Sequence, residues 1–315
     1  MSDHDQIPEI DEQRRDVVRS LSAIAGMTAL AGLVRSEMAL AQDDESDLLP
    51  NGLPRSSLDA EPAVVEFDRP LDLTDPSDAW YAKIKATNNL AGAKTYVPMF
   101  SRAYICPQGQ PSHPVFGHCG IWTWQLQKAT TDEFEDAREG SMIQRALYTG
   151  TILDPYTFEP VETLENPYTG ETITVEDSIF AMNYLLHPMG GGRDIDIAEF
   201  YNPEEKPDTP YVRFGDEVAF VLAGLFQGEG DYQPRADSSW WTTNYAQLID
   251  PDQPLVETRY NFTGLMRAWE RPWLGVEKPD QTQLLWAVEG RKVHSIDRIP
   301  DLLHKHVLSK YDDRV

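Results

Sequence analysis

A strict alternation in one segment constrains the fold of this chain more than any other feature of its sequence. Within residues 115–128, the large apolar side chains Trp122, Trp124 and Leu126 alternate with threonine and glutamine. Alternation with a period of two places successive side chains on opposite faces of an extended chain. The segment therefore predicts a strand with one buried, aromatic face.

Similar strand patterns recur at short intervals through the rest of the chain. Further strands are predicted at 96–105, 142–153, 178–186, 211–226, 240–248, 255–265 and 282–293. A short helix is predicted over 76–90, and a closing amphipathic helix over 297–311. Many strands joined by turns indicate an all-β protein, mainly an antiparallel barrel or sandwich that includes lipocalin-like forms, with a short C-terminal helix. A closed barrel of this size can hold one small ligand.

Two similar hexapeptides predict tight turns in the middle of the chain. Residues 154–159 read Asp-Pro-Tyr-Thr-Phe-Glu, and residues 166–171 read Asn-Pro-Tyr-Thr-Gly-Glu. Asp or Asn bonds back to the turn backbone, proline fixes φ, and Gly170 tolerates a left-handed conformation. These turns predict that segments 142–153, 159–165 and 171–176 form a three-stranded antiparallel meander.

The N-terminal segment has the order of a twin-arginine signal peptide. Arg14 and Arg15 precede the uncharged run 20–34, and Ala39 and Ala41 stand at the −3 and −1 positions of a cleavage site. The 15-residue uncharged run is too short for a transmembrane helix, which needs about 20 residues. We therefore predict a signal peptide over 1–41, partners in the twin-arginine export machinery and signal peptidase, and an exported protein, periplasmic or extracellular.

The charge and composition of the remainder limit its partners. Residues 42–75 are acidic and rich in proline, and predict a flexible arm ahead of a single mainly-β domain over 76–315. The chain carries 52 acidic and 27 basic side chains, a net charge of −25. This charge excludes nucleic acid as a partner and argues against anionic membrane surfaces.

Two cysteines flank a turn-rich connection. Cys106 and Cys119 stand at the ends of a Pro/Gly-rich segment between two strand-like runs. In an oxidising compartment this arrangement predicts a disulfide across a hairpin, and two free buried thiols are the alternative. The segment also holds His113 and His118, but the spacing matches no standard zinc pattern, so no metal site is predicted.

One group of residues forms the main site hypothesis. Arg102 and Tyr104 share one face of a predicted strand, and the following strand carries His118 beside the aromatic run. We hypothesise that these three residues form the polar end of a ligand site floored by Trp122 and Trp124, with His118 as a general acid or base. The competing interpretation is a solid aromatic core, with Arg102 in a surface ion pair.

Other candidate residues are scattered along the chain. His187 ends a strand and is a second acid–base candidate, whereas Arg259, Trp269 and Trp273 belong to a segment where arginine and aromatic residues are interleaved. Arginine beside tryptophan can stack and clamp a carboxylate, and structural ion pairs are the alternative. The sequence contains no Walker loop, dinucleotide fingerprint, HExxH motif or serine nucleophile elbow, so no cofactor is predicted.

Segments 154–175 and 259–293 resemble the bacterial family called domain of unknown function 1838, and the likeness extends over residues 76–305. Phe158 departs from the family pattern, which has glycine in the first turn, and so does the run 273–276. The family name implies relatedness without an activity. More loosely, the predicted architecture is similar to lipocalin-like hydratases that act on carotenoids and related lipids.

These observations favour an exported β-barrel protein that binds a small hydrophobic or amphipathic molecule. Such a protein needs an apolar pocket with one or two polar anchors. The first alternative is a cofactor-free hydratase or isomerase acting on such a molecule, which needs an acid–base side chain inside the pocket. The second is a structural protein associated with the cell envelope.

Overall fold

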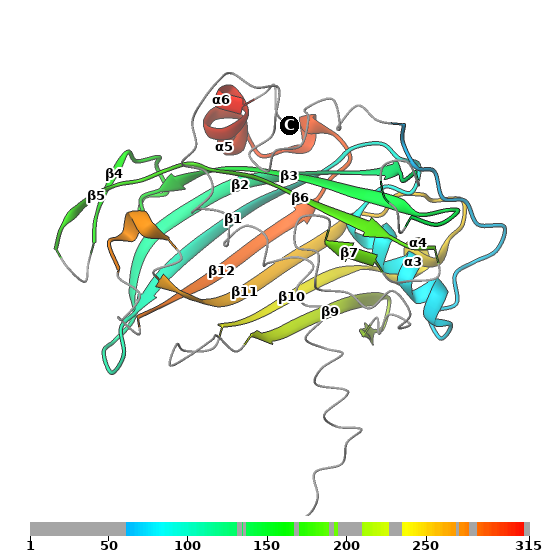
Figure 1. Ribbon diagram of the computed structural model, residues 1–315, viewed down its shortest axis with the longest axis horizontal. Helices are drawn as coiled ribbons and strands as arrows, with labels where there is room; N and C mark the ends of the chain where they lie inside the picture. The colour runs from blue at the N-terminus through cyan, green and yellow to red at the C-terminus, as the bar shows by residue number, and fades with distance from the viewer. Residues whose placement is uncertain are drawn as a thin grey trace, which may run out of the picture.

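The computed structural model describes residues 61–130, 134, 137–166, 170–188, 192–194, 210–226, 235–268, 271–276 and 282–311. One antiparallel sheet of ten strands dominates this part of the chain, in the order β7-β6-β3-β2-β1-β12-β11-β10-β9-β8 (Figure 1). The prediction of a mainly antiparallel β protein with a short C-terminal helix is confirmed. The signal peptide predicted at 1–41 lies outside the described residues.

The elements follow the predicted order closely. The sheet contains β1 (Thr95–Cys106), β2 (His113–Lys128), β3 (Met142–Leu153), β6 (Ser178–Leu186), β7 (Gly192–Asp194), β8 (Tyr211–Phe214), β9 (Glu217–Phe226), β10 (Arg235–Asn244), β11 (Thr258–Arg267) and β12 (Gln283–Lys292). A separate pair comprises β4 (Thr163–Glu165) and β5 (Thr172–Thr174). The helical elements are α3 (Pro76–Thr87), α4 (Tyr245–Ile249), η4 (Pro272–Leu274), η5 (Ile296–Arg298), α5 (Asp301–Leu303), η6 (His304–Leu308) and α6 (Ser309–Tyr311).

The sheet is strongly curved, so its two faces differ (Figure 1). Strands β6 and β9 are distant in the strand order, yet Tyr184 on β6 and Leu222 on β9 line one small cavity beneath α3. The face that joins them is therefore the concave face. It carries the main hydrophobic core, which includes side chains of α3 and of most strands in the sheet.

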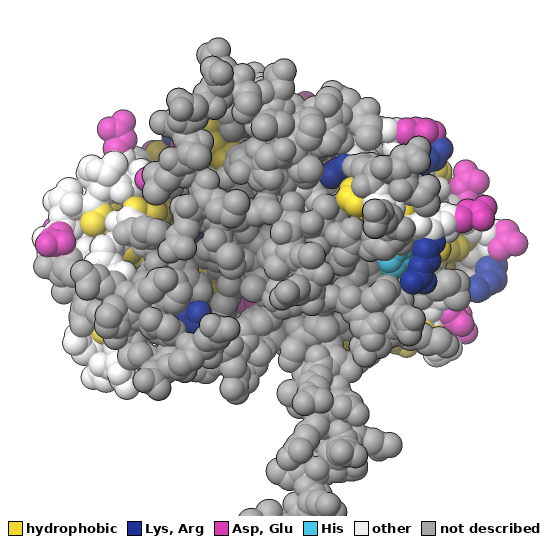
Figure 2. Space-filling model, in the orientation of Figure 1, with side chains coloured by type: hydrophobic (Ala, Val, Ile, Leu, Met, Phe, Trp, Pro, Cys, Tyr) yellow, Lys and Arg dark blue, Asp and Glu magenta, His cyan; other side chains and the backbone are white. Residues whose placement is uncertain are grey.

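The C-terminal helices cover part of the convex face (Figure 1). Leu303 and Val307 pack with Cys119, Ile121 and Leu153 in a second, smaller core. Since the predicted C-terminal helix had apolar residues at helical spacing, its amphipathic character is confirmed. Acidic and basic side chains are interspersed over the described surface visible in Figure 2.

Helix α3 is fixed at both ends by side chains. At its start, the Asp75 carboxylate accepts hydrogen bonds from the backbone N–H groups of Ser77 and Asp78, at 2.8 and 3.2 Å, and Pro76 follows at the first helical position. At its end, the buried Lys292 ammonium donates to the carbonyl oxygens of Lys85 and Asn88 at 2.6 and 2.9 Å. These bonds attach the helix to β12.

Residues 61–73 are packed against the domain. Ala63, Leu71 and Leu73 are buried, and the backbone N–H of Ala63 donates to the carbonyl oxygen of Leu126 at 3.0 Å. The prediction of a flexible arm is therefore wrong for this stretch, because its widely spaced apolar residues suffice to dock it. Residues 42–60 lie outside the described part.

The turn predicted at 154–159 exists, and Asn166 and Gly170 make the backbone hydrogen bonds expected of the second turn, but the predicted meander is wrong. Strand β3 pairs with β6, whereas β4 and β5 pair with each other in a two-stranded sheet. Only an isolated bridge joins Leu153 to Pro160. The backbone N–H groups of Asp154 and Val161 form this bridge by donating to the carbonyl oxygens of Glu159 and Ile152, at 2.8 and 3.3 Å. Strand β3 already pairs with β2 on one side and with β6 on the other.

Phe158 adopts a left-handed backbone conformation, with φ of 60°, at the position equivalent to Gly170, whose φ is 74°. This conformation costs a non-glycine residue about 1–2 kcal/mol. The Phe158 ring compensates by packing against the smaller core and beneath the Arg102 guanidinium, whose carbon lies 4.9 Å from the ring centroid. The aromatic ring explains why glycine is dispensable here.

The bounds of two predicted strands also differ from the structure. The strand predicted at 240–248 ends at Asn244, whose side chain accepts a hydrogen bond from the backbone N–H of Gln247 at 3.0 Å and begins helix α4. The strand predicted at 211–226 is interrupted by a turn at Gly215, where φ is 59°.

The predicted disulfide is wrong, because both cysteines are free. Cys119 pairs with Phe100, which precedes Cys106 by six positions in β1. At a rise of about 3.4 Å per residue the two cysteines are roughly 20 Å apart, well beyond the 7 Å limit for bridged Cα atoms. The prediction placed Cys119 at the end of the connection between the strands. Strand β2 instead begins at His113, so Cys119 lies inside it.

Candidate functional site

The structure divides the residues of the main site hypothesis between the two faces of the sheet. His118 pairs with Ser101 and lies on the concave face, where the Ser101 hydroxyl is 3.4 Å from its Nδ1. Arg102 follows Ser101 and therefore points to the convex face, where it stacks on Phe158. Burial alternates along β1, so Tyr104 shares the face of Arg102. The proposed grouping of Arg102, Tyr104 and His118 is wrong.

Trp122 and Trp124 do lie on the concave face with His118, and they belong to a longer row of aromatic rings. The row runs from Trp273 through Phe116, Trp286, His118, Tyr148, Trp122, Trp124 and Trp241 to Tyr260, with successive ring centroids 4.3–5.9 Å apart. We call this set the aromatic row. Tilted and edge-on rings at such distances attract one another beyond the effect of burial.

The centre of the aromatic row is a buried pair, His118 and Tyr148. The Tyr148 hydroxyl lies 3.1 Å from Nδ1 and 2.9 Å from Nε2 of His118, so it lies over the face of the imidazole, and the two rings are stacked with centroids 5.6 Å apart. Two glycines provide the space: a Cβ at Gly120 would meet the Tyr148 hydroxyl at 2.1 Å, and one at Gly150 would meet His118 Nε2 at 2.7 Å.

The environment of this pair keeps both rings neutral. Burial, assisted by the positive charge of Arg271, lowers the pKa of His118 to about 3. Burial also raises the pKa of Tyr148 well above its ordinary value. The Arg271 guanidinium lies over the Trp286 ring, with its carbon 5.1 Å from the centroid. A neutral imidazole beside a phenol can accept or pass on one proton.

A small cavity lies at the other end of the aromatic row, between α3 and the sheet. A water-sized sphere can move its centre within about 30 Å³ of it. Its lining comprises Trp80, Lys83, Ile84, Thr87, Trp124, Gln144, Tyr184, Leu186, Leu222 and Trp241. We call this space the α3 cavity.

Several buried hydrogen-bond donors of the α3 cavity have no acceptor among the described residues. These are the indole N–H groups of Trp80, Trp124 and Trp241. The ammonium of Lys83, whose residue is 6% exposed, has no acceptor in the described part of the chain and lies 5.1 Å from the centroid of the Trp80 ring. Burial lowers the pKa of Lys83 to about 8. Buried donors are nearly always paired, so such a cluster demands an explanation.

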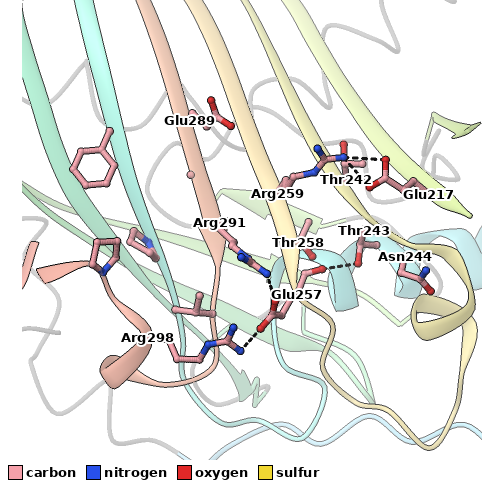
Figure 3. Close-up of a pocket in the computed structure, with 15 residues that line it drawn as sticks. Glu217, Thr242, Thr243, Asn244, Glu257, Thr258, Arg259, Glu289, Arg291 and Arg298 are labelled. Atoms are coloured by element: carbon pink, nitrogen blue, oxygen red, sulfur yellow. Dashed lines mark hydrogen bonds and ion pairs between the residues drawn. The ribbon is translucent and has the colours of Figure 1, made fainter.

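A second and larger hollow lies on the convex face, with a volume of about 720 Å³ (Figure 3). Its charged side chains largely satisfy one another. Arg259 donates to both carboxylate oxygens of Glu217 at 2.8 and 2.9 Å, and Glu257 is bonded by Arg291 and Arg298. These groups are substantially exposed. We call this space the convex groove.

The remaining predicted residues have separate locations. Arg259 is in the convex groove, where it makes the structural ion pair that was the alternative to a role beside the aromatic residues. Trp273 is half-buried and packs on Phe116, with ring centroids 5.2 Å apart. His187 is buried, with its Nδ1 3.0 Å from the Ser141 hydroxyl. Trp269 lies outside the described residues.

Sequence reasoning overlooked Lys83 and Trp80. A signal was present, because Trp80, Lys83, Ile84 and Thr87 follow helical spacing in a segment already predicted to be helical. A lysine within an otherwise apolar helical face points to a buried cation. Tyr148 gave no comparable signal, because it lies in a strand that is buried along its whole length and its partner is set by the sheet register.

No protein-family model matches the chain, and no curated protein does. Some solved structures match weakly. They include the attachment invasion locus protein Ail of Yersinia pestis, with 6% identity over 64% of this chain and 99% of that one, at a TM-score of 0.17. A LolA superfamily protein from Nitrosomonas europaea shares 10% identity over 73% and 96% of the two chains, at a TM-score of 0.17.

A third match is a protein of the domain of unknown function 1329 family from Desulfovibrio piger. It shares 8% identity over 75% of this chain and 97% of that one, at a TM-score of 0.20. Likenesses of this size carry no argument about function, so the function of this chain has to be inferred from its own geometry. No helix in the described part of the chain combines the length and apolar character needed to cross a membrane.

Proposed function

We propose that this protein is exported and binds a small amphipathic molecule against the concave face of its sheet. The observation that supports this proposal is the aromatic row, which crosses β2, β3, β10, β11 and β12 and reaches the α3 cavity. Ligand pockets are lined mainly by apolar and aromatic side chains with a few polar groups. The concave face has this composition, whereas the convex groove is built from ion pairs.

The experiment is a thermal-shift screen of purified protein with dodecanoate, dodecan-1-ol and a retinoid. A ligand at one hundred times its dissociation constant stabilises the folded state by about 2.7 kcal/mol. We expect at least one probe to raise the melting temperature and to change tryptophan fluorescence. If no probe does either, the proposal is contradicted.

A pair of variants assigns the binding face. Trp122→Leu alters the aromatic row, whereas Trp240→Leu alters the exposed face of β10. Trp122→Leu should weaken binding at a temperature where the variant is fully folded, and Trp240→Leu should leave binding unchanged. Equal effects of the two variants would contradict binding on the concave face.

One observation favours a second function, acid–base catalysis on the bound molecule. The neutral His118 imidazole and the Tyr148 phenol are within hydrogen-bonding distance inside the aromatic row. This pair suits a hydratase or isomerase without a cofactor. Incubation with unsaturated fatty acids in deuterated water would reveal either activity by mass spectrometry, as added water or as incorporated deuterium. Retention of such activity in His118→Gln would contradict this role.

Export itself is tested at the N-terminus. Changing Arg14 and Arg15 to lysine should leave the precursor in the cytoplasm, and the mature protein should begin at Gln42. Export of the double variant at the normal level would contradict the twin-arginine route. Membership of the domain of unknown function 1838 family stays a prediction, as does the structural envelope role.

A further inference from the structure

We propose that the α3 cavity receives a carboxylate, held by the Lys83 ammonium and the indole N–H groups of Trp80, Trp124 and Trp241. This inference rests on the proposed function and deepens it, because it assigns the polar end of the amphipathic ligand. The ligand would be a fatty acid or another apolar carboxylate, with its chain along the aromatic row.

The residues that line the α3 cavity carry donors for which the described residues supply no acceptor. Trp80, Trp124 and Trp241 are between 1% and 4% exposed, and each has a buried N–H without a partner. Leaving one such donor unsatisfied costs about 1–3 kcal/mol, and an unpaired buried charge costs more. Four donors on residues that line one cavity favour a negatively charged, multiply accepting group as its occupant.

Comparison with the other buried lysines shows that Lys83 is a special case. The Lys85 ammonium donates to the carbonyl oxygens of Gln247 and Asp250, at 2.9 and 2.7 Å, and Lys292 likewise donates to two carbonyl oxygens. Those two lysines hold α3 and α4 in place. The Lys83 ammonium makes no such hydrogen bond to a described residue and lies over the Trp80 ring. Its charge therefore serves no comparable structural role.

The size of the α3 cavity selects the kind of anion. A buried water needs about 10–15 Å³ for its centre, so the 30 Å³ here suits about two oxygen atoms. A carboxylate presents two oxygens and one negative charge, which one lysine neutralises. A phosphate is larger and carries more charge than the cavity can balance.

The other polar side chains of the lining do not compete for this role. The Thr87 hydroxyl is a donor to the carbonyl oxygens of Lys83 and Ile84, which lie 3.2 and 3.1 Å from its oxygen. Tyr184 on β6 is the only other titratable side chain among the described lining residues, and Gln144 is uncharged. Lys83 is therefore the group whose charge should control anion binding.

The test measures binding of dodecanoate and methyl dodecanoate to the full chain at pH 7. Losing a hydrogen bond to a charged group weakens binding by about tenfold to a hundredfold. We expect dodecanoate to bind at least about tenfold more tightly than the ester. Lys83→Met should abolish this preference, whereas Lys128→Met, at an exposed lysine, should retain it.

A second readout reports on the donors directly. In protein with ¹⁵N-labelled tryptophan, dodecanoate should shift the indole N–H signals of Trp80, Trp124 and Trp241, and the ester should not. Trp241→Phe, which keeps an aromatic ring and removes the N–H, should weaken dodecanoate binding without affecting the ester. Raising the pH from 8 to 10 should weaken dodecanoate binding in the wild type and not in Lys83→Met.

The outcomes separate this inference from the function on which it rests. Equal affinity for acid and ester would overturn the carboxylate site and leave the apolar binding function intact. A preference for the acid that survives Lys83→Met would also overturn the assignment. Failure of both probes to bind would overturn the carboxylate site and count against the binding function as well.

Discussion

The charged side chains of the concave and convex faces of the sheet differ in whether other described residues pair with them. In the convex groove, Arg259, Arg291 and Arg298 are paired with Glu217 and Glu257, and these side chains are partly open to water. On the concave face, the Lys83 ammonium is buried and has no acceptor among the described residues. The charged side chains of the convex groove therefore neutralise one another, whereas the Lys83 ammonium has no such partner among the described residues.

This difference indicates in which hollow a ligand can gain the most binding free energy. Exposed ion pairs contribute about 0–1 kcal/mol each, and displacing them gives a ligand little. A buried donor without an acceptor among the described residues offers a ligand a strong hydrogen bond. The larger hollow is therefore the weaker candidate, and the small α3 cavity is the stronger one.

The strongest test of the comparison uses adjacent tryptophans on opposite faces of β10. Trp241 is 1% exposed and packs between Trp124 and Tyr260, so Trp241→Ala should lower the free energy of unfolding by about 3–5 kcal/mol. Trp240 is 38% exposed, and Trp240→Ala should change it by less than about 0.5 kcal/mol. Urea denaturation measures both. Similar losses would show that the two faces are packed alike.

Glycines on opposite faces of β2 provide a smaller contrast. Gly120→Ala places a methyl group 2.1 Å from the Tyr148 hydroxyl and should cost about 1–3 kcal/mol by displacing it from His118. Gly117→Ala, whose nearest atoms are 3.2 Å away, should cost less. Denaturation curves give the difference, and a Gly120→Ala variant as stable as Gly117→Ala would contradict the tight packing of Tyr148.

The buried imidazole should make the concave face sensitive to acid. The pKa of His118 is about 3 in the folded protein and 6.5 ordinarily, so between these values the unfolded chain binds a proton that the folded chain does not. Folding stability should therefore fall as pH drops below 6.5, by about 1.4 kcal/mol per pH unit from this residue. His118→Gln should remove this part of the slope. An unchanged slope in stability measurements from pH 6.5 to 5 would contradict a buried neutral imidazole.

The smallest effect is expected at the ion pairs of the convex groove. Arg291 and Arg298 lower the pKa of the Glu257 carboxyl, although burial opposes them. Because these groups are partly exposed, Glu257→Gln should cost at most about 1 kcal/mol, and less in high salt. Thermal denaturation at two salt concentrations measures this. A loss of several kcal/mol would show that the convex groove is not simply a solvated surface.

Much of the secondary structure could be predicted from the sequence. The alternation of residues 115–128 gave a strand with Trp122 and Trp124 on one face, and the turn at Gly170 has the predicted left-handed conformation. These features are local, since side-chain alternation and backbone preference depend on residues close in the chain. The amphipathic C-terminal segment was predictable for the same reason.

The pairing of residues across strands was decided by the tertiary structure alone. Alternation shows that Arg102 and Tyr104 share a face, but only the register of β1 and β2 decides whether that face also holds His118. A shift by one residue exchanges every side chain between faces. The distance between the two cysteines is also set by this register, which pairs Cys119 with Phe100 and not with a residue near Cys106.

The sequence by itself determined a mainly antiparallel β protein with a buried aromatic face, because period-two patterns need no knowledge of distant partners. The helical spacing of Trp80, Lys83 and Ile84 was also present in the sequence, although sequence reasoning overlooked it. Only the tertiary structure decided that Lys83, Trp80, Trp124 and Trp241 line one cavity. The physical reason is that α3, β2 and β10 meet through the curvature of the sheet, which arises from the packing of all its strands together.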